Sequence, residues 1–139
     1  MSAPVVKRID HVGIAVPDLD AALEFYARVF GVESVHEEVN EAQGVREAMV
    51  AVGDTTIQLL APLNDDSTIA KFIDRSGPGL QQLAFEVEDI ETTMAELSAS
   101  GVRLLYPEPR TGTGGSRINF VHPKDAGGVL IELVEPAHH

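Results

Sequence analysis

The sequence contains no cysteine and no tryptophan, and only 5% of its 139 residues are aromatic. The absence of cysteine excludes a disulfide scaffold, a zinc site built on thiolates and a cysteine nucleophile. No apolar run approaches the roughly 20 residues that a membrane-spanning helix needs. The N-terminus lacks the apolar stretch of a secretory signal, so we expect a cytoplasmic protein. The terminal pair His138 and His139 is either a tag remnant or native sequence, and we leave it out of any site.

Positive charge is scarce, because 10 Lys and Arg stand against 22 Asp and Glu and give a formal net charge of −12. This sign is wrong for a protein that neutralises the phosphates of a nucleic acid, so we expect no nucleic acid and no membrane as a partner. A small anionic ligand is still compatible, since its site needs only local cations. With 44% hydrophobic residues and a mean hydropathy of +0.03, the chain has enough apolar material to fold.

The chain consists of two similar halves. Residues 8–23 read RIDHVGIAVPDLDAAL, and residues 79–94 repeat that pattern as GLQQLAFEVEDIETTM. The ends of the halves match too, since IQLLAP at residues 57–62 corresponds to IELVEP at residues 131–136. Each half is therefore one copy of the same structural unit.

Hydrophobic periodicity changes in the same order in both copies. In the first copy, a period of two over residues 9–16 predicts a strand, and a helix follows from the N-cap Asp18 to Phe30, with Gly31 ending it. The second copy predicts a matching helix from near Asp89 to Gly101. Three strand-like runs come after each helix. They cover about residues 32–40, 45–52 and 55–61 in the first copy and about residues 103–106, 116–122 and 128–134 in the second.

The predicted unit is thus βαβββ, present twice in an α+β fold. We expect one domain over residues 1–139, with a first copy over about residues 7–62, a connector over 63–78 and a second copy over about residues 79–136. One domain is expected because neither copy alone would bury its sheet. The segment 107–115 is rich in Pro, Gly and Thr, which predicts a mobile loop at the mouth of a site.

Polar side chains interrupt apolar strand faces at matching positions of the two copies. His11 corresponds to Gln82, and Gln58 corresponds to Glu132. An unpaired carboxylate buried on such a face costs several kcal/mol, and a metal ion or a protonated partner removes that cost. If a pseudo-twofold axis relates the copies, these four side chains converge on one shared partner. Taken singly, each is equally explained as a hydrogen-bonded structural residue or a solvent-facing one.

Glu47 also interrupts an apolar strand face, which it shares with Val45, Met49 and Ala51. It either points into the same cavity or lies on an exposed strand edge. His122 alternates with apolar residues of the next-to-last strand. It either lines the cavity or caps the end of that strand, and we favour the cap.

These motifs resemble those of the methylmalonyl-CoA epimerases, a family of the vicinal oxygen chelate (glyoxalase/bleomycin resistance/dioxygenase) superfamily. The most specific are QGVREAM at residues 43–49 and SRINFVHPKDAGGVLIEL at residues 116–133, whereas IDHVGIAVPDLD at residues 9–20 is typical of the whole superfamily. The resemblance covers nearly the whole chain. It implies that the two βαβββ modules form a cupped, incomplete eight-stranded barrel around a divalent metal ion.

The resemblance implies metal ligands at His11, Gln58, Gln82 and Glu132, and a proton-transfer carboxylate at Glu47. It also implies that Glu132 serves the opposite face of the substrate, with an ordered water as the alternative. Where the family usually has the second histidine of a GLHH stretch, this chain has Gln82, whose amide oxygen is a harder and weaker ligand than imidazole. We therefore expect Co²⁺, with Mn²⁺, Mg²⁺, Ni²⁺ or Zn²⁺ as alternatives.

The implied activity is that of an isomerase that interconverts the 2R and 2S forms of methylmalonyl-CoA by removing the α-proton through a metal-stabilised enolate. The coenzyme A tail carries phosphates, for which Arg117 and Lys124, with Arg110, are the candidate cations; each is equally explained as a surface ion-pair residue. The superfamily also implies a homodimer. Two other functions stay open, namely another glyoxalase-like isomerase, lyase or dioxygenase, and a non-catalytic protein that sequesters a ligand.

Overall fold

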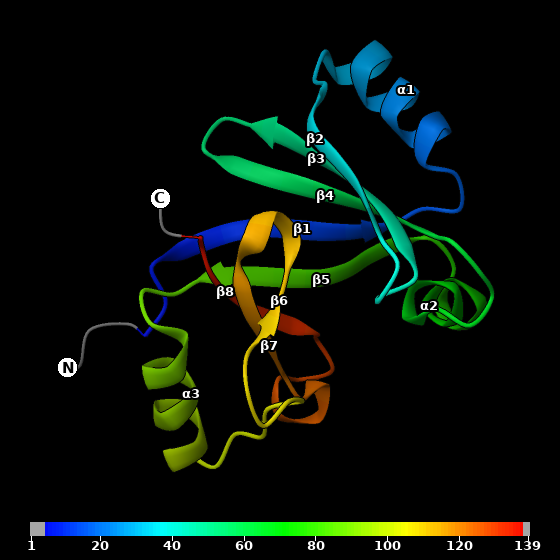
Figure 1. Cartoon of the computed structure of the whole chain (residues 1–139). Helices are drawn as coiled ribbons and strands as arrows, with labels where there is room; N and C mark the ends of the chain where they lie inside the picture. Colours follow the sequence, from blue (N-terminus) through cyan, green and yellow to red (C-terminus); the bar gives the residue numbers. More distant parts are fainter. Residues whose placement is uncertain (1–4, 138–139) are drawn as a thin grey trace. The chain divides into compact units, whose positions relative to one another are not determined.

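The computed structural model describes residues 5–137, so His138 and His139 lie outside the described residues. The chain divides into two compact units (Figure 1). Module one comprises His11–Gln81, and module two comprises the residues before His11 together with those from Gln82 onward. Each module contains one βαβββ unit, which confirms the predicted duplication.

Module one holds most of strand β1 and all of the first repeat. Its strands lie in the order β2-β3-β4-β1, in which β1 runs parallel to β4 and the other neighbours are antiparallel. Its elements are β1 (Arg8–Ala15), α1 (Leu19–Phe30), β2 (Ser34–Asn40), β3 (Val45–Val52), β4 (Thr55–Pro62) and α2 (Thr68–Ser76).

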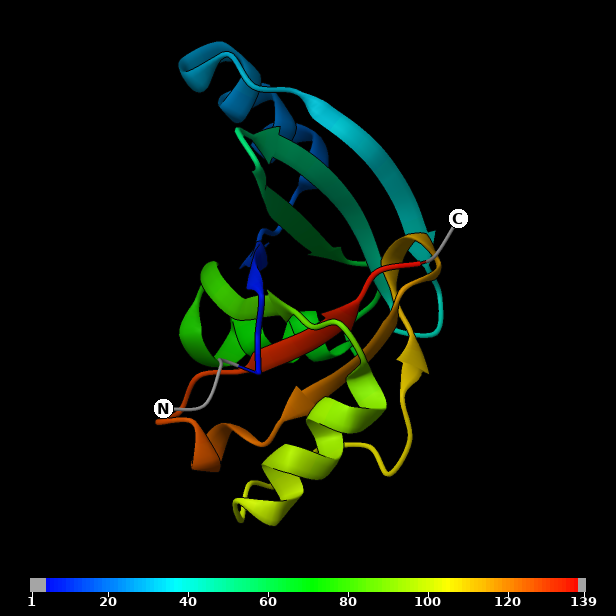
Figure 2. The same cartoon turned by 90° about the vertical axis from the view of Figure 1, so that its left-hand side faces the viewer.

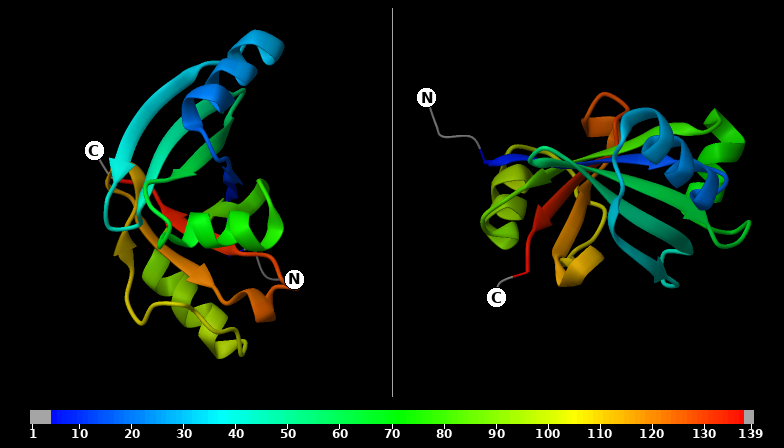
Figure 3. Two further views of the ribbon diagram at one scale, coloured as in Figure 1. Left: turned by 90° about the vertical axis from the view of Figure 1, so that its right-hand side faces the viewer. Right: turned by 90° about the horizontal axis from the view of Figure 1, so that it is seen from above.

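Helix α1 covers one face of this sheet. Ala48 and Leu59 of the sheet are fully buried against Leu19 of the helix, and Figure 3 shows α1, in blue, running along the strands. The helix begins after Asp18, whose side chain accepts a hydrogen bond from the first turn, and it ends at Gly31 with a left-handed φ of 69°. The sequence predicted both ends of this helix.

The opposite face of the same sheet carries His11, Glu47 and Gln58. Successive residues of a strand point to opposite faces, so these polar side chains alternate with the apolar residues that face α1. Helix α2 packs on this polar face at one end, where Ile69 contacts the buried Leu60. The predicted connector therefore contributes a helix to module one.

Module two repeats the arrangement with the strand order β5-β8-β7-β6, in which β5 runs parallel to β8. Its main elements are β5 (Gly79–Glu86), α3 (Ile90–Ala99), β6 (Arg110–Thr111), β7 (Arg117–Val121) and β8 (Ile131–Glu135), with short 3₁₀ helices at Thr113–Gly115 (η1) and Pro123–Asp125 (η2).

Helix α3 covers one face of the module two sheet, as α1 does in module one. Ile90 of the helix is fully buried with Val87 and Leu133, and Figure 2 shows α3, in yellow-green, beside strand β7, in orange. The opposite face carries Glu132 among apolar neighbours, of which Ala84 lies directly beside it on β5. The two modules thus place corresponding polar residues on corresponding faces.

One predicted strand is wrong. Residues 103–106 form only an isolated bridge, between Leu104 and Val121, whereas the paired strand β6 lies at Arg110–Thr111, within the segment predicted as a loop. Pro107 lacks a backbone N–H and therefore cannot continue a ladder from the apolar run.

A side chain takes over part of the backbone pairing at this point. The amide of Asn119 on β7 accepts a hydrogen bond from Tyr106 N at 3.1 Å and donates one to Tyr106 O at 3.0 Å. Asn119 is completely buried. Its amide thus bonds the chain before β6 as a neighbouring strand would.

No helix in the described part of the chain has both the length and the apolar character needed to span a membrane.

Candidate active site

Three polar side chains of module one are buried on the sheet face opposite α1. His11 is 4% exposed, Glu47 3% and Gln58 4%. The strand register sets Gly13 of β1 and Met49 of β3 on either side of Gln58. His11 and Glu47 each lie two residues along the strand from these neighbours, so all three polar side chains occupy the same face.

Gln58 holds the carboxylate of Glu47. The amide Nε2 of Gln58 donates a hydrogen bond to Glu47 Oε2 at 3.0 Å, and both residues are buried. This hydrogen bond fixes the position of the Glu47 carboxylate on its strand face. Because the amide nitrogen is directed to Glu47, the amide oxygen of Gln58 is directed away from it.

Glu47 therefore does not lie on an exposed strand edge, which was one of its two predicted positions. Strand β3 pairs with β2 on one side and with β4 on the other, so it is an interior strand. The carboxylate is buried on the polar face of the module.

Module two holds a similar amide–carboxylate pair. Gln82 Nε2 donates a hydrogen bond to Glu132 Oε1 at 2.9 Å, and Glu132 is 6% exposed. Ala84 of β5 and Phe120 of β7 lie directly beside Glu132 in the register. Ala84 is fully buried, and Phe120 provides an apolar neighbour on the other side of the carboxylate.

Each module carries side chains whose donor atoms suit a divalent cation. Module one has the imidazole of His11 and the amide oxygen of Gln58, and module two has the amide oxygen of Gln82 and the carboxylate of Glu132. Such a mixed oxygen and nitrogen set suits Co²⁺, Mn²⁺ or Zn²⁺, and its oxygens suit Mg²⁺. Among the described residues, no group of three or more His, Cys, Asp or Glu side chains could hold a metal ion.

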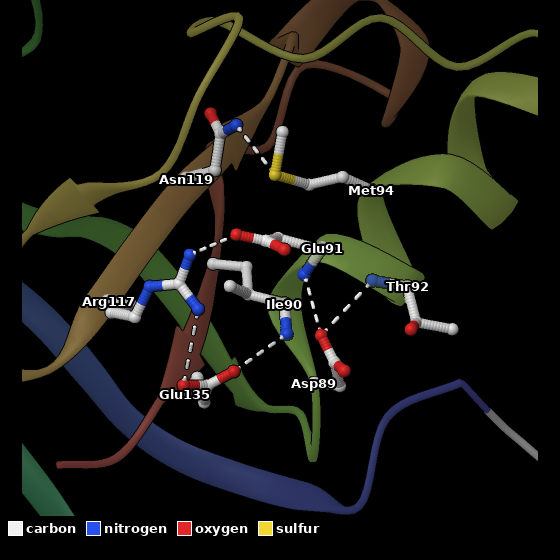
Figure 4. A network of polar contacts seen from close by, with 8 residues as sticks. All are labelled: Asp89, Ile90, Glu91, Thr92, Met94, Arg117, Asn119 and Glu135. Carbon is white, nitrogen blue, oxygen red and sulfur yellow. Dashed lines mark hydrogen bonds and ion pairs between the residues drawn. The ribbon is translucent and has the colours of Figure 1, made fainter.

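Arg117, a predicted coenzyme A ligand, lies on the α3 side of its sheet. It pairs in the register with Glu135, and its guanidinium forms ion pairs with Glu91 and Glu135 (Figure 4). The hydrogen bond to Glu91 is the main cause that raises the pKa of Arg117. Glu135 also accepts a hydrogen bond from Ile90 N at 3.0 Å, so this network fixes the start of α3.

The second predicted cation, Lys124, is exposed on η2. His122 caps this turn by accepting a hydrogen bond from Lys124 N at 3.2 Å, which confirms the cap assigned to His122. Roles of Arg117 and Lys124 in binding coenzyme A stay predictions.

An ion pair that the sequence did not indicate fastens the η2 turn. Asp125 accepts hydrogen bonds from the backbone and the guanidinium of Arg103, at 2.9 to 3.0 Å. These bonds, the side-chain bond first, lower the pKa of Asp125 to about 2. The two residues are far apart in sequence, so no local pattern marks them as partners.

Comparison with known proteins gives consistent results. Residues 10–120 match the sequence family described as the Glyoxalase/Bleomycin resistance protein/Dioxygenase superfamily. The ethylmalonyl-CoA/methylmalonyl-CoA epimerase of Cereibacter sphaeroides is 37% identical over 131 residues, which cover 93% of this chain and 98% of that protein.

Two solved structures are also similar. The crystal structure of methylmalonyl-CoA epimerase from Mycobacterium tuberculosis is 56% identical, with a TM-score of 0.95 over 99% of this chain and 93% of that one. A variant of the Streptomyces coelicolor methylmalonyl-CoA epimerase in complex with 2-nitronate-propionyl-CoA is 47% identical, with a TM-score of 0.91 over 96% of this chain and 99% of that one. These similarities confirm the predicted fold class.

Proposed function

We propose that this chain, a member of the Glyoxalase/Bleomycin resistance protein/Dioxygenase superfamily, is an isomerase that epimerises methylmalonyl-CoA. The observation that carries this proposal is the buried carboxylate of Glu47, held by Gln58 on the same face as His11. The similarity to named epimerases over more than nine-tenths of the chain supports the substrate. Fold alone would not, because the superfamily fold hosts several reactions.

Glu47 acts as the base in the proposed reaction. It removes the proton from the carbon between the thioester and the carboxylate, and the electron pair moves into the thioester carbonyl to give a planar enolate. A base must be held in a fixed position near the proton that it removes, and the hydrogen bond from Gln58 fixes the carboxylate of Glu47.

Glu132 takes a proton from solvent and delivers it to the opposite face of the enolate, and Glu47 passes the proton that it removed to solvent. This role requires the two modules to bring Glu47 and Glu132 to the two sides of one substrate, which we propose on the basis of the sequence repeat. Gln82 holds Glu132 as Gln58 holds Glu47, so each proposed proton-transfer carboxylate has an amide donor. An ordered water is the alternative on the second face.

We propose that His11, Gln58, Gln82 and Glu132 together hold one divalent cation. The ion would stabilise the negative charge that develops on the thioester oxygen. Two amide oxygens, one imidazole and one carboxylate favour Co²⁺, with Mn²⁺, Mg²⁺, Ni²⁺ or Zn²⁺ as the alternatives.

Isotope exchange at the substrate tests the proposed function. The protein is incubated with one epimer of methylmalonyl-CoA in D₂O, without metal and with each of Co²⁺, Mn²⁺, Mg²⁺, Ni²⁺ and Zn²⁺. The product is analysed for deuterium at the α-carbon and for its configuration. We expect deuterium incorporation together with formation of the other epimer. If neither appears with any of the five metals, the chain is not an epimerase and a ligand-sequestering role is favoured.

Ring-cleaving dioxygenation is less consistent with the proposed ligand set. Iron oxygenases of the facial-triad type use two histidines and one carboxylate. The proposed set contains one histidine, His11, because Gln82 replaces the second. The predicted homodimer and cytoplasmic location stay predictions.

A further inference from the structure

We propose that Arg110 binds a phosphate group of the coenzyme A moiety. This inference rests on the proposed function, because it assigns a binding residue for the acyl-CoA substrate. The sequence alone does not favour Arg110 over Arg117 or Lys124. We base the choice on the strand register and on the ion pairs of module two.

The register places Arg110 on the same sheet face as Glu132. Arg110 of β6 lies directly opposite Ile118 of β7, and Ile118 lies opposite Val134 of β8. Directly paired residues share a face, and Ile118 and Val134 pack together on the face opposite α3. Arg110 therefore projects from the edge strand on the face that carries the proposed catalytic carboxylate, while Arg117 projects from the other.

The charge of Arg110 is available for a ligand. The other arginines of module two, and Lys7, are paired with carboxylates: Lys7 and Arg8 with Glu86, Arg103 with Asp125, and Arg117 with Glu91 and Glu135. In the part of the chain that the structure describes, no carboxylate lies within ion-pair distance of Arg110. An exposed guanidinium without a carboxylate is notable in a chain of net charge −12.

An aromatic pair fixes the position of this guanidinium. Its central carbon lies 4.2 Å from the ring centroid of Tyr106, which in turn contacts Phe120 edge-on at 6.1 Å between centroids. Phe120 lies directly beside Glu132. Asn119 holds the backbone of Tyr106 on both sides, so the rings form a fixed apolar path from the carboxylate to the cation.

The chemistry of the path matches an acyl-CoA. The acyl group would lie near Glu132, an uncharged chain would follow the rings, and a phosphate would meet a guanidinium that can form two hydrogen bonds to it. The carboxylate of the methylmalonyl group is the other anion that Arg110 could bind. We favour the phosphate because Arg110 is exposed on the edge strand β6. It pairs with Ile118, which lies two residues from Phe120 on β7.

The test compares methylmalonyl-CoA with methylmalonyl-pantetheine, which has the same acyl group but no phosphate. For Arg110→Gln we expect KM for methylmalonyl-CoA to rise roughly 10- to 100-fold, the effect of losing one charge-assisted contact, with kcat nearly unchanged. KM for methylmalonyl-pantetheine should be the same in variant and wild type. Arg28→Gln, which removes an exposed arginine on α1, is the matched control and should change neither constant.

Three results would overturn the proposal. The first is an unchanged KM for methylmalonyl-CoA. The second is a raised KM for both substrates, which would assign Arg110 to the acyl carboxylate. The third is a loss of kcat that parallels a loss of the folded state, measured by circular dichroism. If the wild type proves not to be an epimerase, calorimetric titration with coenzyme A separates the two claims. Weaker binding to Arg110→Gln than to the wild type then supports this inference, and equal or absent binding to both overturns it.

Discussion

Glu47 is a buried carboxylate that accepts a hydrogen bond from the amide of Gln58. Replacing it by glutamine keeps the size of the side chain and an oxygen that can accept from Gln58. We predict that Glu47→Gln lowers kcat at least about 100-fold, the usual scale for a lost general base, while the melting temperature and Co²⁺ affinity stay close to wild type. Steady-state kinetics and a metal titration check this. The control is Glu37→Gln, on the neighbouring strand β2, where the side chain is exposed on the opposite sheet face; it should leave kcat nearly unchanged. A kcat of Glu47→Gln near that of the wild type would show that Glu47 is not the base.

Gln82 is the position where a stronger ligand would be most informative. Imidazole binds borderline divalent cations more tightly than an amide oxygen does, so we predict that Gln82→His lowers the Kd for Co²⁺ and Zn²⁺ by about tenfold or more. The same change removes the hydrogen bond to Glu132. Gln81→His, one residue earlier and on the other strand face, is the matched control. Equal Kd values for wild type and Gln82→His would indicate that Gln82 is not a ligand.

At the scale of elements, the turn between β6 and β7 depends on the absence of a side chain at Gly112. A Cβ atom there would lie 2.6 Å from Cγ2 of Ile118 and 2.8 Å from Oγ of Ser116. We predict that Gly112→Ala lowers the free energy of unfolding by about 1–3 kcal/mol, as overpacking commonly does. Denaturant unfolding measures this. A variant as stable as the wild type would show that β6 shifts easily, which would also weaken the fixed position of Arg110.

The η2 turn should lose its ion pair in acid. The pKa of Asp125 is about 2 in the folded chain against an ordinary value of 3.8, mainly because Arg103 donates to its side chain. A lowered folded pKa stabilises the fold above the unfolded value, and this stability is lost as the pH falls from about 4 to about 2. We predict that wild type exceeds Asp125→Asn in unfolding free energy above pH 5 and that the difference shrinks across this window. A constant difference down to pH 2 would contradict the ion pair.

Most elements could be predicted from local patterns, and the one error has a non-local cause. Asp18 as an N-cap and Gly31 as a C-cap predicted both ends of α1, and period-two alternation predicted the bounds of β3. Residues 103–106 are mostly apolar but form only an isolated bridge, at Leu104. Leu105 N donates to Phe120 O, and the side chain of Asn119 bonds both backbone groups of Tyr106 in a way that depends on tertiary packing.

At the scale of the whole molecule, the sequence repeat predicted which polar residues correspond, but not how each is held. Equating His11 with Gln82 and Gln58 with Glu132 needed only the duplicated pattern. The hydrogen bond between Gln58 and Glu47 depends on the register of β3 against β4, which no local pattern sets. The ion pairs of Arg117 likewise join residues brought together only by packing.

Metal analysis of the protein, together with Co²⁺ titration of one variant from each module, tests whether both modules supply ligands to one cation. We predict about one Co²⁺ per wild-type chain, and a Kd raised at least about 100-fold in both His11→Ala of module one and Glu132→Ala of module two. Wild-type affinity in either variant, or two cations per chain, would contradict a single site shared by the modules.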